Sequence, residues 1–322
     1  MESSNAASVE AVARATCVLF AYHEMGYAGM ETLLAMGAPI AALYTHRDDP
    51  HEEIWWRSCI DLAERNHIAV HTLEALDDAS IAAVAALRPS VIYSFYYRHL
   101  IPERVLNLPC AGAYNLHGSL LPAYRGRAPV NWMLVNGERE AGVTLHHMVA
   151  RADAGDIVAQ RSVAIEDRDT ALSLYRKLVA LGAQVIREFH PLIVTGRAPR
   201  RAQDLSKGSY YGRRRPEDGR IDWHWPARRI FNLIRAVTHP YPGAFCLVGG
   251  RKLFIWQAAL GAETGSWGAP GEIINEAAGG ALEIAAGEGS LIVTRAQFAN
   301  AAQGAARNVL SAELLKGRVC LE

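Results

Sequence analysis

The sequence has few cysteines and no excess of charge of either sign. Its 322 residues include five cysteines, which are scattered along the chain and form no C-x-x-C pair. This pattern is typical of buried free thiols in a reducing compartment and does not match a disulfide framework. Lys plus Arg and Asp plus Glu both number 33, so the formal net charge is zero. The chain as a whole therefore has no strong attraction for nucleic acid or an anionic membrane.

Long hydrophobic runs are also missing. Half of the residues are hydrophobic and a fifth are charged, a composition typical of a folded globular protein. No apolar run reaches the length of a membrane span, and residues 1–15 are polar where a signal peptide needs an apolar segment. We therefore expect a cytoplasmic protein without a membrane partner, built from about two domains.

The first two thirds of the chain alternate between apolar runs and helical patterns. Strands are expected at 17–22, 40–44, 91–95 and 111–117, with helical segments at 30–36, 55–66 and 80–87 between them. Strands separated by helices predict a Rossmann-like α/β fold with a parallel sheet. We expect this catalytic domain to span 16–203, after a loose N-terminal extension at 1–15.

The character of the sequence changes after Pro191. A linker is expected at 204–216, where three consecutive arginines begin at Arg213. Short apolar runs interrupted by glycines then continue to the end of the chain. This pattern predicts a small β-rich, OB-like domain over 217–322.

Asn115 and His117 are the first candidates for chemistry. They lie two residues apart in the expected strand AYNLH, so both side chains point to the same face near its carboxyl end. An imidazole exchanges protons near neutral pH, and a carboxamide N–H stabilises negative charge on a carbonyl oxygen. A structural histidine at a strand end is the plainer interpretation of His117.

Asp153 is the third candidate. It lies in the turn sequence RADAGD that follows another expected strand, where its loop should meet the loop after His117. Aspartate in such a turn usually serves the local backbone. If it lies near His117, its charge would stabilise the imidazolium form.

These residues belong to a longer resemblance. The run NLHGSLLPAYRGRAP from Asn115 resembles the signature of the folate-dependent formyltransferases, and D-A-G at Asp153 matches their third active-site element. The segments RPEDGRIDW and RAVTHPYPGAF resemble the C-terminal module of the same family. The resemblance implies formyl transfer from 10-formyltetrahydrofolate to an amine, with Asn115, His117 and Asp153 as the catalytic residues.

A closer resemblance within the family is to the formyltransferase half of bifunctional polymyxin-resistance enzymes. It rests on FAYHEMG, SFYYRHLIP and GVTLHHMVARADAGDIVAQ, together with the run from Asn115 to Glu138. This implies a UDP-linked substrate, UDP-4-amino-4-deoxy-L-arabinose, whose 4-formamido product serves lipid A modification. The chain is too short for the decarboxylase domain of those enzymes, so decarboxylation is not expected.

The resemblance also implies which residues contact the folate. By motif position these are His99, Leu100, Ile101, Arg127, Val149, Ala150, Arg151, Ala152 and Asp153. Core packing is the alternative for Leu100 and Ile101. His146 and His147 are adjacent in a strand and face opposite sides, so a structural role is favoured over a joint metal site. No zinc motif is present, and no metal is expected.

Contacts to the nucleotide sugar are expected from the linker and the second domain. The candidates are Arg213, Asp222, Trp223, Arg235 and Tyr241. Guanidinium groups bind diphosphate well, but an arginine run is more often a solvated linker. Aromatic side chains such as Trp223 and Tyr241 serve a core as readily as a ligand.

Three other functions are considered. A methionyl-tRNA formyltransferase would share the catalytic residues, but tRNA binding needs a cationic surface, and residues 217–322 hold ten basic and ten acidic residues. A scaffold without activity has no need of all three polar residues. Other nucleotide-linked amino sugars, such as dTDP sugars, remain open because the sequence does not display the shape of a pocket.

Overall fold

The structure is a computed structural model that describes residues 10–50, 52–73, 75–311 and 321. Its contacts divide the chain into two compact units. The first unit comprises Met1–Pro129, Glu140–Ala164 and Tyr175–Gly212, and the second comprises Val130–Arg139, Ile165–Leu174 and Arg213–Glu322. The boundaries expected from the sequence are continuous, whereas each unit collects separate segments. Residues 1–9 of the expected extension lie outside the described residues, and residues 10–14 are helical.

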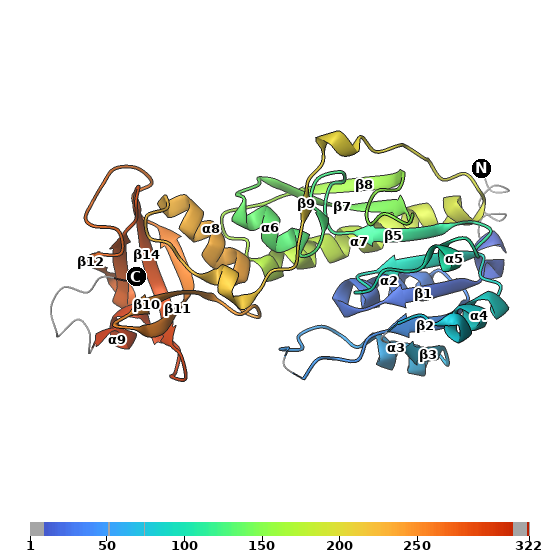
Figure 1. Ribbon diagram of the computed structural model, residues 1–322, viewed down its shortest axis with the longest axis horizontal. Coiled ribbons are helices and arrows are strands. Elements are labelled where there is room, and N and C mark those ends of the chain that lie inside the picture. The colour runs from blue at the N-terminus through green and yellow to red at the C-terminus, as the bar shows by residue number, and fades with distance from the viewer. Residues whose placement is uncertain (1–9, 51, 74, 312–320, 322) are drawn as a thin grey trace. The chain divides into compact units, whose positions relative to one another are not determined.

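The first unit is built on a seven-stranded sheet in the order β3-β2-β1-β4-β5-β7-β8 (Figure 1). The strands are β1 (Cys17–Ala21), β2 (Ile40–Thr45), β3 (Ala69–Thr72), β4 (Val91–Phe95), β5 (Ala113–His117), β7 (Glu140–His147) and β8 (Ile157–Ala164). Neighbouring strands from β3 to β5 pair in parallel, which confirms the predicted Rossmann-like α/β fold. Strands β7 and β8 pair antiparallel to their neighbours.

Besides the helical residues 10–14, five helices accompany this sheet among the described residues. They are α2 (His23–Ala35), α3 (Cys59–Arg65), α4 (Asp78–Ala86), α5 (Glu103–Leu106) and the long α7 (Ala171–Val194), whose first turn belongs to the second unit. Side-chain caps begin two of them. Ser58 Oγ accepts from the Asp61 N–H before α3, and the Asp77 carboxylate accepts from the Ser80 N–H before α4. Such caps typically contribute about 1 kcal/mol each.

Helix α2 begins seven residues earlier than the sequence pattern indicated. Glycine is a weak helix former and favours turns, but Gly26 and Gly29 lie inside this helix and allow close packing. A Cβ atom on Gly29 would come within 2.6 Å of the Phe95 ring of β4. These glycines therefore bring the helix close to the sheet.

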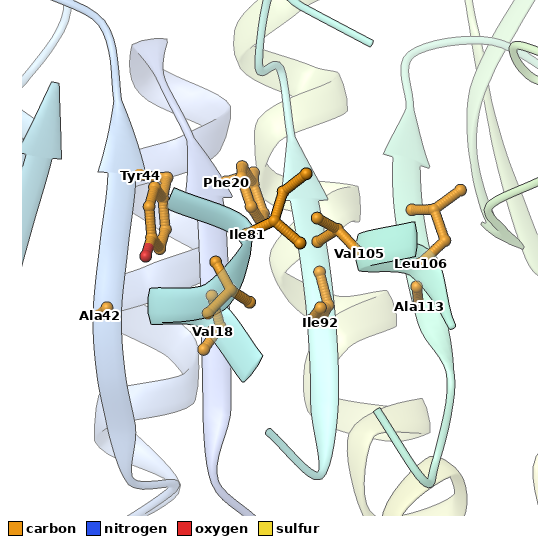
Figure 2. Packing of buried hydrophobic residues seen from close by; sticks show 10 residues of the cluster. Val18, Phe20, Ala42, Tyr44, Ile81, Ile92, Val105, Leu106 and Ala113 are labelled. Atoms are coloured by element: carbon orange, nitrogen blue, oxygen red, sulfur yellow. The ribbon is translucent and has the colours of Figure 1, made fainter. Parts of the chain in front are cut away.

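One face of the sheet carries an apolar cluster. Figure 2 shows side chains of β1, β2, β4 and β5 covered by Ile81 of α4 and by Val105 and Leu106 of α5. Burying each large aliphatic side chain contributes about 1.5–3 kcal/mol. Ala113 of β5 belongs to this cluster, so the alternation of a strand places Asn115 and His117 on the same face, further along β5.

The second unit is β-rich, as predicted. Its six-stranded antiparallel sheet has the order β10-β11-β14-β13-β12, with β15 paired to β14. The strands are β10 (Ala244–Val248), β11 (Arg251–Leu260), β12 (Ile273–Ala277), β13 (Ala281–Ala285), β14 (Ser290–Phe298) and β15 (Gly304–Ala305). Helices α6 (Pro129–Val135), α8 (Ala227–Val237) and α9 (Ala306–Val309) complete it. Across the described ranges of both units, no helix is long and apolar enough to cross a membrane.

Candidate active site

Strand β5 brings the two predicted polar side chains into the interior of the first unit. His117 is buried, with 7% of its surface exposed, and Asn115 is half-buried. Their strand lies between β4 and β7, which shield its two edges. The arrangement confirms that Asn115 and His117 share a face, as their spacing predicted.

The hydrogen bonds of His117 define which nitrogen can accept a proton. Nε2 lies 2.8 Å from the carbonyl oxygen of Tyr124. Because a carbonyl only accepts, Nε2 carries the hydrogen, and in the neutral ring Nδ1 keeps its lone pair. Nδ1 in turn lies 3.6 Å from Asp153 Oδ1. A proton taken up at Nδ1 would therefore be held beside a carboxylate.

Asp153 reaches the site on the connection between β7 and β8. Because β7 runs antiparallel to β5, this connection begins level with the amino end of β5, and its loop must turn back to meet His117. Asp153 adopts a left-handed backbone conformation with φ of 53°. Gln203 Nε2 donates to the carbonyl oxygens of Asp153, at 3.1 Å, and Gly155, at 2.5 Å, and thereby holds the turn. The sequence offered no signal for Gln203.

The environment of Asp153 favours its ionised form. Burial alone would raise the pKa of this carboxyl, but His117 and His146 in their protonated forms, together with the Gly126 N–H, hold the pKa well below its usual value. The Gly126 N–H donates to Oδ2 at 2.9 Å. Glycine is needed at position 126, since φ is 96° and a Cβ atom would meet the Tyr211 carbonyl oxygen at 2.3 Å. The loop after β5, which carries the run GSLLPAYRGRAP and is called the signature loop below, therefore supplies a donor that keeps the carboxylate charged.

His146 is a fourth member of the site that sequence reasoning missed. It is almost fully buried and lies directly opposite Asn115 in the pairing of β5 with β7. Its Nε2 lies 3.1 Å from Asn115 Nδ2 and 3.6 Å from Asp153 Oδ1. The expected opposite orientation of His147 is confirmed, since that ring packs 4.6 Å from the Tyr114 ring. Only the strand pairing, which the sequence does not display, could have placed His146 here.

The residues expected to contact folate form two groups, one exposed and one packed. Leu100 is 76% exposed and Val149 is 45% exposed, so two large apolar side chains face solvent on loops of this unit. His99, Arg127, Ala150 and Arg151 are exposed, and Ala152 is half-buried. Ile101 packs against the apolar cluster, in line with the core-packing alternative. Exposed apolar side chains such as Leu100 and Val149 are suited to covering a flat aromatic ring system.

A hydrogen bond joins two of the loops expected to contact folate. Arg127 Nη2 donates to the carbonyl oxygen of Arg98 at 2.9 Å, which connects the signature loop to the segment after β4. The hydrogen bond fixes the Arg127 guanidinium at the backbone of Arg98, the residue that precedes His99. Among the residues that the structure describes, no group of three or more His, Cys, Asp or Glu side chains could hold a metal ion.

The residues expected to contact the nucleotide sugar lie in the second unit, where several serve its interior. Trp223 is 2% exposed, and burial raises the pKa of Tyr241 to about 12. Arg235 is buried and donates to Asn232 Oδ1 and to the Glu166 carbonyl oxygen. Arg213 and Asp222 are exposed. The structure thus buries Trp223 and Arg235 and leaves Arg213 and Asp222 accessible.

Two protein-family models match this chain. The model described as formyl transferase matches residues 23–189, and the model described as formyl transferase, C-terminal domain, matches residues 214–313. The first match alone covers more than half of the chain and contains Asn115, His117, His146 and Asp153. The chain therefore belongs to the formyl transferase family. It is a formyl-transferring enzyme.

Solved structures with the same fold include sugar N-formyltransferases. An N-formyltransferase from Helicobacter canadensis, in complex with folinic acid and dTDP-3-aminofucose, is 21% identical, with a TM-score of 0.69 over 86% of this chain and 98% of that chain. WlaRD, a sugar 3N-formyl transferase solved with dTDP and 5-N-formyl-THF, is 20% identical, with a TM-score of 0.66 over 89% and 98% of the two chains.

HypX from Aquifex aeolicus in complex with tetrahydrofolic acid also has a similar fold. It is 20% identical, with a TM-score of 0.62 over 94% of this chain and 48% of HypX. The chain therefore spans about half the length of HypX. At these identities the likeness to all three proteins concerns the fold.

Proposed function

We propose that this enzyme transfers the formyl group of 10-formyltetrahydrofolate to the amine of a nucleotide-linked amino sugar. The observation that carries the proposal is the buried group formed by Asn115, His117 and Asp153, with a lone pair on His117 Nδ1 beside a carboxylate. Attack of an amine on a formyl carbon needs a proton acceptor and a donor for the developing oxyanion. The group contains both.

Each residue has a distinct part in this chemistry. His117 takes the amine proton at Nδ1, while its Nε2–H stays bonded to the Tyr124 carbonyl oxygen. The same ring then gives this proton to the donor nitrogen of the folate as the bond from that nitrogen to the formyl carbon breaks, so that tetrahydrofolate leaves. Asp153 stabilises the resulting imidazolium by charge. An N–H of Asn115 donates to the formyl oxygen as negative charge develops there. When bound, the folate co-substrate supplies the activated formyl group.

The folate contacts proposed are those on the loops around this group. Leu100 and Val149 would cover the pterin ring with their exposed apolar side chains, and backbone groups from Val149 to Asp153 would bind its polar edge. Arg127, held by the Arg98 carbonyl oxygen, would contact an anionic or carbonyl oxygen of the ligand. Replacing Leu100 with aspartate tests the first contact, and we expect a raised KM for the folate with unchanged folding.

The acceptor proposed first is UDP-4-amino-4-deoxy-L-arabinose. The support is the resemblance of FAYHEMG, SFYYRHLIP and the signature run to the formyltransferase half of the polymyxin-resistance protein ArnA. The product would be the 4-formamido sugar used in lipid A modification. The dTDP-linked sugars are the second candidate, because similar folds are solved with dTDP-3-aminofucose and with dTDP. Arg213 and Asp222, which are accessible, are the proposed contacts of the second unit to the nucleotide.

Tetrahydrofolate release is the measurement that tests this function. The purified enzyme is given 10-formyltetrahydrofolate with UDP-4-amino-4-deoxy-L-arabinose, dTDP-3-aminofucose or methionyl-tRNA in parallel. We expect fast release with the UDP sugar, and none in the His117→Ala variant. Release only with the dTDP sugar would move the acceptor to the second candidate. Release only with the tRNA, or with none of the three, would refute the amino-sugar proposal.

A further inference from the structure

His146 has no part in the roles proposed for Asn115, His117 and Asp153, although it contacts two of them. Its side chain is 1% exposed and lies opposite Asn115 on the neighbouring strand. Its Nε2 is the partner of the Asn115 carboxamide at 3.1 Å. A histidine with this burial and this partner is part of the site rather than of the solvated surface.

The hydrogen positions on His146 follow from its other nitrogen. Nδ1 lies 2.8 Å from the carbonyl oxygen of His147, which can only accept. Nδ1 therefore carries the hydrogen, and in the neutral ring Nε2 presents a lone pair. The atom of Asn115 that faces Nε2 must then be the donor Nδ2, because Oδ1 in that place would repel the lone pair. The contact thus sets the direction of the whole carboxamide.

The two N–H groups of Asn115 are held unequally. One is directed at His146 Nε2 at 3.1 Å, and the other approaches Asp153 Oδ1 at the longer distance of 3.4 Å. The longer contact is the weaker one, since hydrogen bonds of this type are strongest near 2.9 Å. One N–H is therefore anchored, and the other makes only a long contact that a new acceptor in its path can replace.

We propose that His146 is a positioning residue that anchors the Asn115 carboxamide, so that its second N–H is presented to the formyl oxygen. This inference rests on the proposed function, because it assigns His146 a part in formyl transfer through Asn115. Without an acceptor at position 146, only the longer contact to Asp153 Oδ1 favours this orientation, and the carboxamide turns over more readily. Its Oδ1 would then face the formyl oxygen, and the two oxygens would repel each other as negative charge develops.

A double-mutant cycle tests whether His146 acts through Asn115. His146→Leu removes the acceptor and keeps a side chain of similar size, while His146→Gln restores an acceptor oxygen. We expect kcat to fall about 10- to 100-fold in the leucine variant. A misplaced oxyanion donor can lower kcat by as much as the loss of that donor, but by no more. The KM for the folate should stay within a factor of about three, and glutamine should recover part of the rate. In the Asn115→Ala background, His146→Leu should have no further effect on kcat.

His147→Leu is the matched control on the same strand. His147 faces the opposite side and lines a cavity of about 330 Å³ with Cys110, Tyr114 and Arg200. We expect the kcat of this variant to stay near that of the wild type. An equal loss in both leucine variants would show that only the strand was disturbed and would overturn the proposal. So would an undiminished effect of His146→Leu in the Asn115→Ala background, which would make His146 an independent catalytic group.

The ring tautomer of His146 supplies a readout that needs no acceptor sugar. Nitrogen-15 NMR of the ring should show a protonated Nδ1 and an unprotonated Nε2 in the wild type, and the Nε2 resonance should move in Asn115→Ala. A protonated Nε2 in the neutral ring would overturn the proposal. If the wild type releases no tetrahydrofolate with any amino sugar, the proposed function fails while this result still stands.

Discussion

Replacing Asp153 with asparagine should remove most of the activity while leaving the fold intact. The substitution keeps the shape of the side chain but removes the charge 3.6 Å from His117 Nδ1. At an effective dielectric constant of 20, the attraction between a protonated His117 ring and this carboxylate is about 4–5 kcal/mol. The amide would also donate a hydrogen bond to Nδ1, which occupies the lone pair that accepts the amine proton.

These two effects act on the same step. We expect kcat to fall by about three to four orders of magnitude, since removing the charge from the carboxylate of the analogous His-carboxylate pair in serine proteases lowers kcat about 10⁴-fold. The assay is tetrahydrofolate release at saturating folate and acceptor, with Asp156→Asn as the matched control. Asp156 lies on the same connection and pairs with Arg200 at 2.6 Å on the surface, so its variant should keep the wild-type rate. An Asp153→Asn enzyme within threefold of the wild type would refute the role given to this carboxylate.

Three further predictions concern the site and the fold. Asn115→Ala should lower kcat by about two to three orders of magnitude with a small change in KM, as loss of an oxyanion donor does, and steady-state kinetics measures it. Burial lowers the pKa of His190 to about 4, so between pH 6.5 and 4 the unfolded state binds a proton that the folded state does not. As the pH falls from 6.5 to 4, the free energy of unfolding should therefore decrease by up to about 1.4 kcal/mol per pH unit. Urea titrations of His190→Gln should show a shallower pH dependence than those of the wild type. Gly29→Ala should destabilise the protein by about 1–3 kcal/mol, because the new Cβ would approach the Phe95 ring at 2.6 Å. Gly212→Ala meets no atom within 4 Å and should leave the melting temperature unchanged.

Much of the first unit could be predicted from local patterns. The apolar runs of β1, β2, β4 and β5 alternate with helical segments, and this alternation is enough to indicate a parallel α/β sheet. The start of α2 was misplaced because glycine is a weak helix former and reads as a turn. In the structure the Phe95 ring leaves no room for a Cβ atom at Gly29, and this contact joins segments far apart in the sequence.

The candidate site shows the same division between local and distant information. Asn115 and His117 could be paired from the sequence, because the period of a strand puts residues two apart on one face. His146 could not be joined to them, since its contact with Asn115 depends on the antiparallel pairing of β5 with β7. The part of Gln203 in the site could not be predicted either, because it also depends on a contact between distant parts of the chain. Gln203 holds the Asp153 turn from 50 residues away, through backbone carbonyls that carry no sequence signal.

The sequence by itself determined the fold class, the family signature and the three polar residues to which the proposed chemistry is assigned, because these depend on local periodicity and on residue type. Only the tertiary structure decided which nitrogen of His117 is free, how Asp153 stays charged and what anchors Asn115. Those properties arise from atoms of the Tyr124 carbonyl, the Gly126 N–H and the His146 ring. Their distances are set by strand pairing and loop closure, which bring distant parts of the chain together only when it is folded.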